Sequence, residues 1–124
     1  MIRPALADEI YEPFEYGWVA EENDKVVGHV AVSILSGAPF IHALSYAGND
    51  SFGTASLLIR ARKQVRDMGF RETYLNVSCD SAELDRDRLD QLADALESLG
   101  FGVMLRPLLT HGFTPVQLIL RGTV

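Results

Sequence analysis

Short apolar runs with the length and composition of β-strands dominate the first part of the chain. One run at 17–22 and a longer one at 25–35 flank Asn23-Asp24, a polar pair that is typical of tight turns. This arrangement predicts an antiparallel hairpin. The second run is almost continuously apolar from Val26 to Ile34, which predicts a strand in the interior of a sheet.

The next segments change from strand-like to helix-like. A turn cluster at 36–39 precedes a β-prone stretch at 40–46 and a loop at 47–51. From Phe52 the apolar positions recur at helical spacing, and Gly69 supplies the expected C-terminal stop. The residues predicted to share the buried face of this helix are Ala55, Leu58, Ile59, Arg62, Val65 and Met68.

The rest of the chain completes an α/β (α+β) pattern. It predicts a strand at 73–78, a second helix from about Asp80 to Gly100, and final strands at 101–105 and 116–120. The order is β-β-β, helix, β, helix, β-β. We therefore expect one domain over residues 1–124, with a mixed, mostly antiparallel sheet flanked by helices.

Composition and charge exclude several classes of protein. Hydrophobic residues make up 48% and charged residues 23% of the chain, as in an ordinary globular domain with one apolar core. The formal net charge of -6 opposes nonspecific binding to nucleic acid. The lone Cys79 forms no internal disulfide, no Cys or His pair has metal-ligand spacing, and no apolar run could span a membrane. We expect a cytoplasmic protein with no metal and no nucleic-acid or membrane partner.

The stretch from 40 to 101, with lead-in strands from residue 17, resembles the acyl-CoA-binding core of the GNAT superfamily of N-acetyltransferases. The carrying segment is Asp50-Ser51-Phe52-Gly53-Thr54-Ala55. It occupies the frame of the family signature: Arg or Gln, two arbitrary residues, Gly, one arbitrary residue, then Gly or Ala. In that motif, backbone N–H groups at a helix N-terminus face the cofactor's pyrophosphate, and glycine permits their close approach.

The resemblance implies a transferase that moves an acetyl group from acetyl-CoA (coenzyme A) to an amine of a small molecule or peptide, without a covalent enzyme intermediate. It implies that His42, on the strand before the loop, is the catalytic base, directly or through water. The alternative is a partly buried strand histidine bonded to backbone or solvent. The implied cofactor-binding residues are Leu44, Ser45 and Tyr46, through their backbone along the pantetheine arm, and Ser51, Phe52, Gly53, Thr54, Ala55 and Ser56 at the helix start.

The hydroxyls at the helix start have a second interpretation, because Ser and Thr at such positions are often helix caps. Departures from the family pattern also favour a second function. Asp50 replaces a cation or amide, and two like charges near contact repel by about 1 kcal/mol in water. Leu96 stands where many members have a Tyr that protonates the departing thiolate.

The N-terminal region is also short for the family. Met1 to Ala5 looks like the opening strand, yet only about a dozen residues separate it from Gly17, where two helices normally lie. The second hypothesis is therefore a GNAT-fold interaction or regulatory module without catalysis, for which a homodimer is one arrangement. The resemblance also implies that the strands at 40–46 and 73–78 run parallel and diverge toward their C-terminal ends, which would open a cleft for a pantetheine arm.

Overall fold

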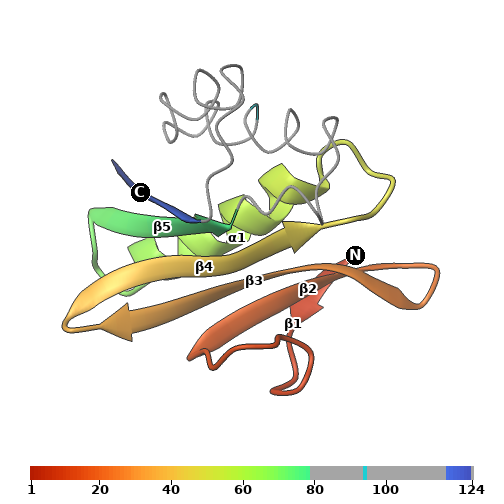
Figure 1. Cartoon of the computed structure of the whole chain (residues 1–124), viewed down its shortest axis with the longest axis horizontal. Coiled ribbons are helices and arrows are strands. Elements are labelled where there is room, and N and C mark those ends of the chain that lie inside the picture. The colour runs from red at the N-terminus through yellow and green to blue at the C-terminus, as the bar shows by residue number, and fades with distance from the viewer. Residues whose placement is uncertain (79–93, 95–116, 124) are drawn as a thin grey trace.

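The computed structural model describes residues 1–78, 94 and 117–123. Within these residues, six strands form one sheet in the order in which they occur in the sequence, and one long helix packs on it (Figure 1). The elements are β1 (Ile2–Pro4), β2 (Tyr16–Glu22), β3 (Lys25–Leu35), β4 (Ala38–Tyr46), α1 (Gly53–Asp67), β5 (Glu72–Ser78) and β6 (Gln117–Thr123).

The pairing of the strands confirms the predicted mixed, mostly antiparallel sheet. Every neighbouring pair is antiparallel except β4 and β5, which are parallel. The predicted hairpin is β2 and β3, with Asn23 at a φ of 51° and Asp24 at 62° in the turn, as two-residue hairpin turns require. The predicted strand at 40–46 begins earlier, at Ala38, because Ser36 and Gly37 form a second tight turn with positive φ.

The ends of the chain agree with the prediction where the structure describes them. The expected opening strand is β1, and the expected strand at 116–120 is β6, which pairs antiparallel with β5. The predicted second helix, apart from Asp94, which is helical, and the predicted strand at 101–105 lie outside the described residues. In the described part of the chain no helix has the length and apolarity needed to cross a membrane.

The two faces of the sheet are covered by different parts of the chain. Val30 and Val32 belong to the larger core, which includes the buried side of α1, whereas Ala31 packs against Ile10 of the β1–β2 loop. Successive strand side chains point to opposite faces. The helix therefore covers one face, and the loop at 5–15 covers part of the other.

The helix confirms the predicted element but not all of the predicted face. Gly69, at a φ of 94°, follows α1 as the expected stop. Leu58 and Val65 are fully buried as predicted, but Ile59 is 53% exposed, so its predicted burial was wrong. The buried stripe is centred about one residue earlier along the helix than the apolar pattern indicated. Its members are Gly53, Thr54, Leu57, Leu58, Ala61 and Val65.

One extra residue interrupts β4 where it pairs with β3. The register shifts by one between His29 and Ala31 of β3, so that Ala43 and Leu44 of β4 oppose Val30 alone. Ala43 adopts a φ of 53°, which is uncommon for a residue with a side chain. This is a β-bulge, a feature that re-aims the side chains around it.

The bulge changes which face the β4 side chains occupy. Ile41 and Tyr46 both belong to the core under α1, although they are an odd number of residues apart. Ala43 belongs to the cluster on the opposite face. Without the extra residue, Ile41 and Tyr46 would lie on different faces.

The parallel pairing between β4 and β5 is short. Its register covers Phe40↔Tyr74 and Ile41↔Leu75, although both strands continue beyond these residues. The predicted parallel pairing of these strands is therefore confirmed, whereas the predicted cleft between their C-terminal ends stays a prediction. From 42 onward, the edge of β4 toward β5 carries no ladder pairing within the described residues.

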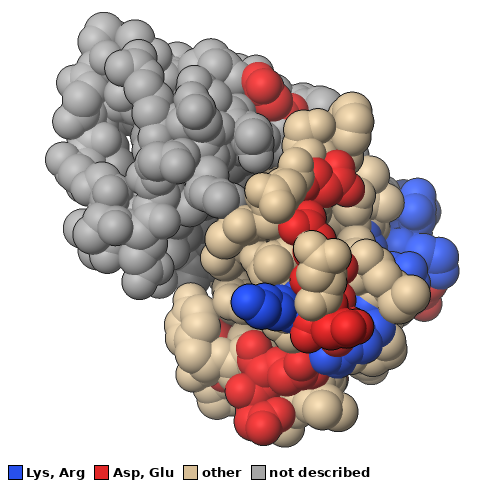
Figure 2. All heavy atoms as spheres, turned by 90° about the vertical axis from the view of Figure 1, so that its right-hand side faces the viewer, with Lys and Arg blue, Asp and Glu red and all other residues tan. Residues whose placement is uncertain are grey.

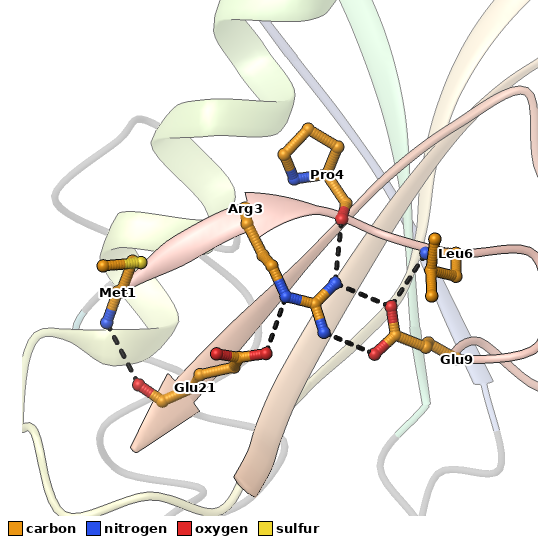
Figure 3. A network of polar contacts seen from close by, with 6 residues as sticks. All are labelled: Met1, Arg3, Pro4, Leu6, Glu9 and Glu21. Atoms are coloured by element: carbon orange, nitrogen blue, oxygen red, sulfur yellow. Dashed lines mark hydrogen bonds and ion pairs between the residues drawn. The ribbon is translucent and has the colours of Figure 1, made fainter. Parts of the chain in front are cut away.

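Arg3 fastens the β1–β2 loop to the sheet (Figure 3). Its guanidinium donates to both carboxylate oxygens of Glu9, at 2.8 and 2.7 Å, and to Glu21 Oε1 at 2.6 Å. It also donates to the Pro4 carbonyl, and Glu9 Oε1 accepts the Leu6 N–H at 2.8 Å. A two-pronged Arg–carboxylate pair fixes geometry as well as charge. The loop is therefore held to β2 by a network with defined orientation.

The Arg3–Glu9 pair predicts an acid-dependent loss of stability. The hydrogen bond from Arg3, followed by that from Leu6, lowers the pKa of Glu9 from 4.5 to about 2. A carboxyl group whose folded pKa is lowered stabilises the fold above its unfolded pKa, and this contribution is lost as the pH falls toward the folded value. The melting temperature of Glu9→Gln should therefore lie furthest below that of wild type above pH 4.5, and the difference should shrink toward pH 2.

The matched control is Asp67→Asn, because Asp67 pairs with Lys63 on the exposed surface of α1. Exposed pairs contribute little, so this variant should stay close to wild type. A Glu9→Gln difference that is the same at pH ~6 and pH ~3 would contradict the assignment.

Candidate functional site

Tyr46 joins the end of β4 to the start of α1. Its side chain is only 6% exposed, and its ring packs against Gly28, Gly48 and Gly53. A Cβ at Gly28 would lie 2.7 Å from the ring, and a Cβ at Gly48 or Gly53 would overlap the hydroxyl or the ring itself. The helix can begin beside the end of β4 only because residue 53 has no side chain.

The Tyr46 hydroxyl belongs to a polar network around Glu22. It donates to Glu22 Oε1 at 2.6 Å, and the same carboxylate accepts the backbone N–H of Asn49 at 3.0 and 3.1 Å and that of Asp50 at 3.2 Å. Burial, and then the Glu22 contact, raise the pKa of Tyr46 to about 12. The hydrogen bonds from Tyr46 and Asn49 lower the pKa of Glu22. Glu22 is therefore an anion that the 47–50 loop already holds.

The start of α1 keeps some backbone donors unused. Asp50 Oδ1 accepts the Phe52 N–H at 2.9 Å, and the Gly53 N–H donates to the Asp50 carbonyl at 3.1 Å. The N-cap residue is Phe52, and no side chain caps the helix within the described residues. The amides of Thr54 and Ala55 donate to no residue that the structure describes. These two donors point out of a helix N-terminus, where anions are favoured.

The residues just before the predicted phosphate-binding set at 51–56 are occupied by the protein's own groups. Glu22 accepts the backbone N–H groups of Asn49 and Asp50, so these two amides are not open to a pyrophosphate. Figure 2 looks at this end of the molecule, which is on the right in Figure 1, and shows several acidic patches through the middle of its described surface, with basic side chains beside them. An anionic ligand would therefore be drawn to the helix start and repelled by Glu22 and Asp50.

His42 lies on the face of the sheet opposite α1, and both of its ring nitrogens have partners. Nδ1 contacts the Glu12 carboxylate, and Nε2 lies 2.8 Å from Ser33 Oγ. The imidazole is 12% exposed and Glu12 is 36% exposed. The three side chains line a pocket of about 260 Å³ together with Pro13, Leu35 and Phe40.

The histidine that the sequence singled out is therefore neither isolated nor bonded only to backbone. Glu12 comes from the β1–β2 loop and Ser33 from β3, so its partners were not visible from neighbouring residues. Sequence reasoning also missed Glu22. The signal available for Glu22 was a carboxylate at the end of a strand, which is too common to single it out.

The predicted pantetheine contacts lie beyond the two described ladder pairs between β4 and β5. Leu44 is in the bulge, Ser45 pairs with His29 of β3, and Tyr46 ends the strand. Leu44 and Ser45 have no ladder partner on β5 within the described residues. Among the same residues, no group of three or more His, Cys, Asp or Glu side chains is arranged to hold a metal ion.

The fold is shared with known acetyltransferases. An IAA acetyltransferase from Bacillus cereus superposes with a TM-score of 0.68 at 14% identity, covering 100% of this chain and 99% of that one. An acetyltransferase of the GNAT family from Staphylococcus aureus gives 0.59 at 15% identity, covering 87% and 67%. PaiA N-acetyltransferase from Thermoplasma acidophilum, in complex with coenzyme A, gives 0.57 at 15% identity, covering 87% and 60%.

No family model matches the sequence, and no curated protein sequence matches it. At these identities the structural likeness establishes the fold and leaves the activity open. The protein has the GNAT fold, which confirms the architecture that the resemblance implied.

The packing of Tyr46 predicts that Gly53 cannot be replaced. In Gly53→Ala the new methyl group would overlap the buried Tyr46 ring, and overpacking of this kind costs about 1 to 3 kcal/mol of unfolding free energy. Denaturant unfolding should show this loss. Combining Gly53→Ala with Tyr46→Leu should recover part of it, because the ring is gone; equal costs of Gly53→Ala in both backgrounds would contradict the clash.

Proposed function

We propose that the protein is an acyl-CoA-dependent N-acetyltransferase that transfers an acetyl group from acetyl-CoA to the amine of a small molecule or peptide. The observation that carries this proposal is the end of the β4–β5 ladder at Ile41 and Leu75. Beyond Ile41, β4 has no ladder partner on β5 within the described residues, and this part of β4 lies between the start of α1 on one face and His42 on the other. The coenzyme A bound to a neighbour of the same fold supports the class of cofactor.

The described residues fit such a cofactor at two places. The amides of Thr54 and Ala55, which donate to no described residue, would hold the pyrophosphate, with Ser51, Phe52, Gly53 and Ser56 around them. The backbone of Leu44, Ser45 and Tyr46, beyond the described β4–β5 ladder pairs, would lie along the pantetheine arm. Bound acetyl-CoA supplies a thioester carbonyl that an amine attacks directly, with no covalent enzyme intermediate.

His42 would accept the proton that the amine loses. Its Nε2 is bonded to Ser33 Oγ, so the proton would pass through that hydroxyl or reach the ring once the hydroxyl moves aside. Glu12 contacts Nδ1, and a carboxylate there orients the ring and stabilises the imidazolium that forms. Glu12 is thus a positioning residue for this base.

The second candidate is a GNAT-fold interaction or regulatory module without catalysis. The observation that favours it is the Glu22 carboxylate on the amides of Asn49 and Asp50, where a bound phosphate would otherwise find donors. With these two amides bonded to Glu22, the loop offers fewer donors to an anionic cofactor.

Binding of acetyl-CoA separates the two candidates. At about 100 times its dissociation constant, a ligand adds about 2.7 kcal/mol to the free energy of unfolding, so the melting temperature should rise.

Asp50→Asn should bind acetyl-CoA more tightly by about 5-fold, because it removes a repulsion of about 1 kcal/mol while its amide oxygen can still accept the Phe52 N–H. The gain should shrink at high salt.

Asp67→Asn is the control for this measurement, since it removes the same charge at the other end of α1, about 20 Å away. Its affinity for acetyl-CoA should match wild type in calorimetric titration. If neither wild type nor Asp50→Asn binds acetyl-CoA, the module without catalysis is the better description.

The role of His42 is tested by the rate of thiol release from acetyl-CoA with a panel of amino acids, polyamines and peptides. His42→Gln should lower the rate by ~10², because general bases contribute ~10² to 10⁴. The affinity for acetyl-CoA should stay the same, since His42 lies on the face opposite the helix start. A variant that keeps the full rate would assign His42 a structural role.

A further inference from the structure

Ser33, His42 and Glu12 form a hydrogen-bonded line that the proposed acetyl transfer does not fully explain. Ser33 Oγ contacts Nε2 of the imidazole at 2.8 Å, and the opposite ring nitrogen, Nδ1, contacts the Glu12 carboxylate. This is the order of atoms by which hydrolases activate a serine: hydroxyl, Nε2, Nδ1, carboxylate. A triad is recognised by this geometry and not by sequence position.

Three separate parts of the fold hold the line in place. Ser33 and His42 lie on the paired strands β3 and β4, where Ser33 pairs with Phe40 and His42 with Ala31. Glu12 belongs to the loop at 5–15. Arg3 connects this loop to β2, because its guanidinium donates to both Glu9 and Glu21. A carboxylate on Nδ1 keeps the proton there and leaves Nε2 as the acceptor for the serine proton.

The serine faces a pocket. Ser33 is 8% exposed and lines the pocket of about 260 Å³ on the face opposite α1. The other side chains of the pocket, apart from the triad, are apolar: Pro13, Leu35 and Phe40. A wall of this kind accommodates the hydrocarbon part of a small acyl group and excludes large polar ones.

We propose that Ser33 is a nucleophile and that this pocket hydrolyses small activated acyl esters. Ser33 Oγ attacks the acyl carbonyl carbon while its proton passes to His42 Nε2, and the leaving alcohol takes that proton as its bond to the carbonyl breaks. Water then attacks the acyl-Ser33 ester, giving a proton to Nε2, which returns it to Ser33 Oγ as the carboxylic acid leaves. Atoms and charge balance without a cofactor or metal.

This activity goes beyond the proposed acetyl transfer and does not depend on it. No coenzyme takes part, so its test stands whether or not the protein binds acetyl-CoA. With an amine and a thioester, His42 would accept the proton of the amine in direct transfer. Hydrolysis of simple esters would instead measure the activity of Ser33 alone.

The test uses the full chain with two probes: a small fluorophosphonate, which labels activated serines covalently, and p-nitrophenyl acetate. We expect one label per chain, located at Ser33 by mass spectrometry of peptides. Ser33→Ala should reduce both labelling and ester hydrolysis to background. His42→Gln should slow labelling by ~10², and Glu12→Gln, which no longer fixes the tautomer, by at least ~10-fold.

Matched controls separate this role from damage to the fold. Ser36→Gly removes an exposed serine hydroxyl from the β3–β4 turn, where the φ of 52° suits glycine, and should label like wild type. Circular dichroism and melting temperature should show that Ser33→Ala and Glu12→Gln remain folded. No label on wild type, or label that persists in folded Ser33→Ala, would overturn the proposal and leave the line of three residues as a structural contact between strands and loop.

Discussion

The bulge at Ala43 decides which face of the sheet each side chain of the candidate site occupies. His42 and Tyr46 are four residues apart, so a regular strand would put both on one face. The extra residue puts Tyr46 under α1 and leaves His42 on the opposite side, against Glu12 and Ser33. The candidate anion-binding amides and the candidate base His42 therefore lie on opposite faces of the sheet, near the end of the β4–β5 ladder pairing.

Tyr46 supplies the second constraint, because it fixes the helix start against the end of β4. Residue 53 must be glycine because the Tyr46 ring packs on it. This steric constraint holds with or without a cofactor. The glycine of a Gly-x-Ala segment is therefore weak evidence for phosphate binding when read alone. Stronger evidence comes from backbone donors that bond to nothing in the described part of the chain, and here those are the amides of Thr54 and Ala55.

Local patterns predicted the hairpin turn at 23–24 and the end of the helix at Gly69, because each depends on neighbouring residues. The parallel pair β4–β5 was predicted from the family resemblance and agrees with the structure. The bulge was not predictable, since an alanine at positive φ carries no signature. The helix face was misjudged at Ile59, an apolar residue that lies away from the sheet and is 53% exposed. The partners of His42 and Tyr46 were missed because they come from other elements: Glu12 is 30 residues from His42, and Glu22 is 24 from Tyr46.

Competition between anions limits where a phosphate could bind. At the amides of Asn49 and Asp50 it would have to displace Glu22, which also accepts from the Tyr46 hydroxyl. Displacement would break the hydrogen bonds that the Tyr46 hydroxyl and the two amides donate to Glu22, which opposes the exchange. The amides of Thr54 and Ala55 donate to no described residue, and an anion there would also benefit from the helix dipole. An anion would therefore be held more easily at the first turn of α1 than at the loop, and the Glu22 carboxylate would stay beside any ligand bound there.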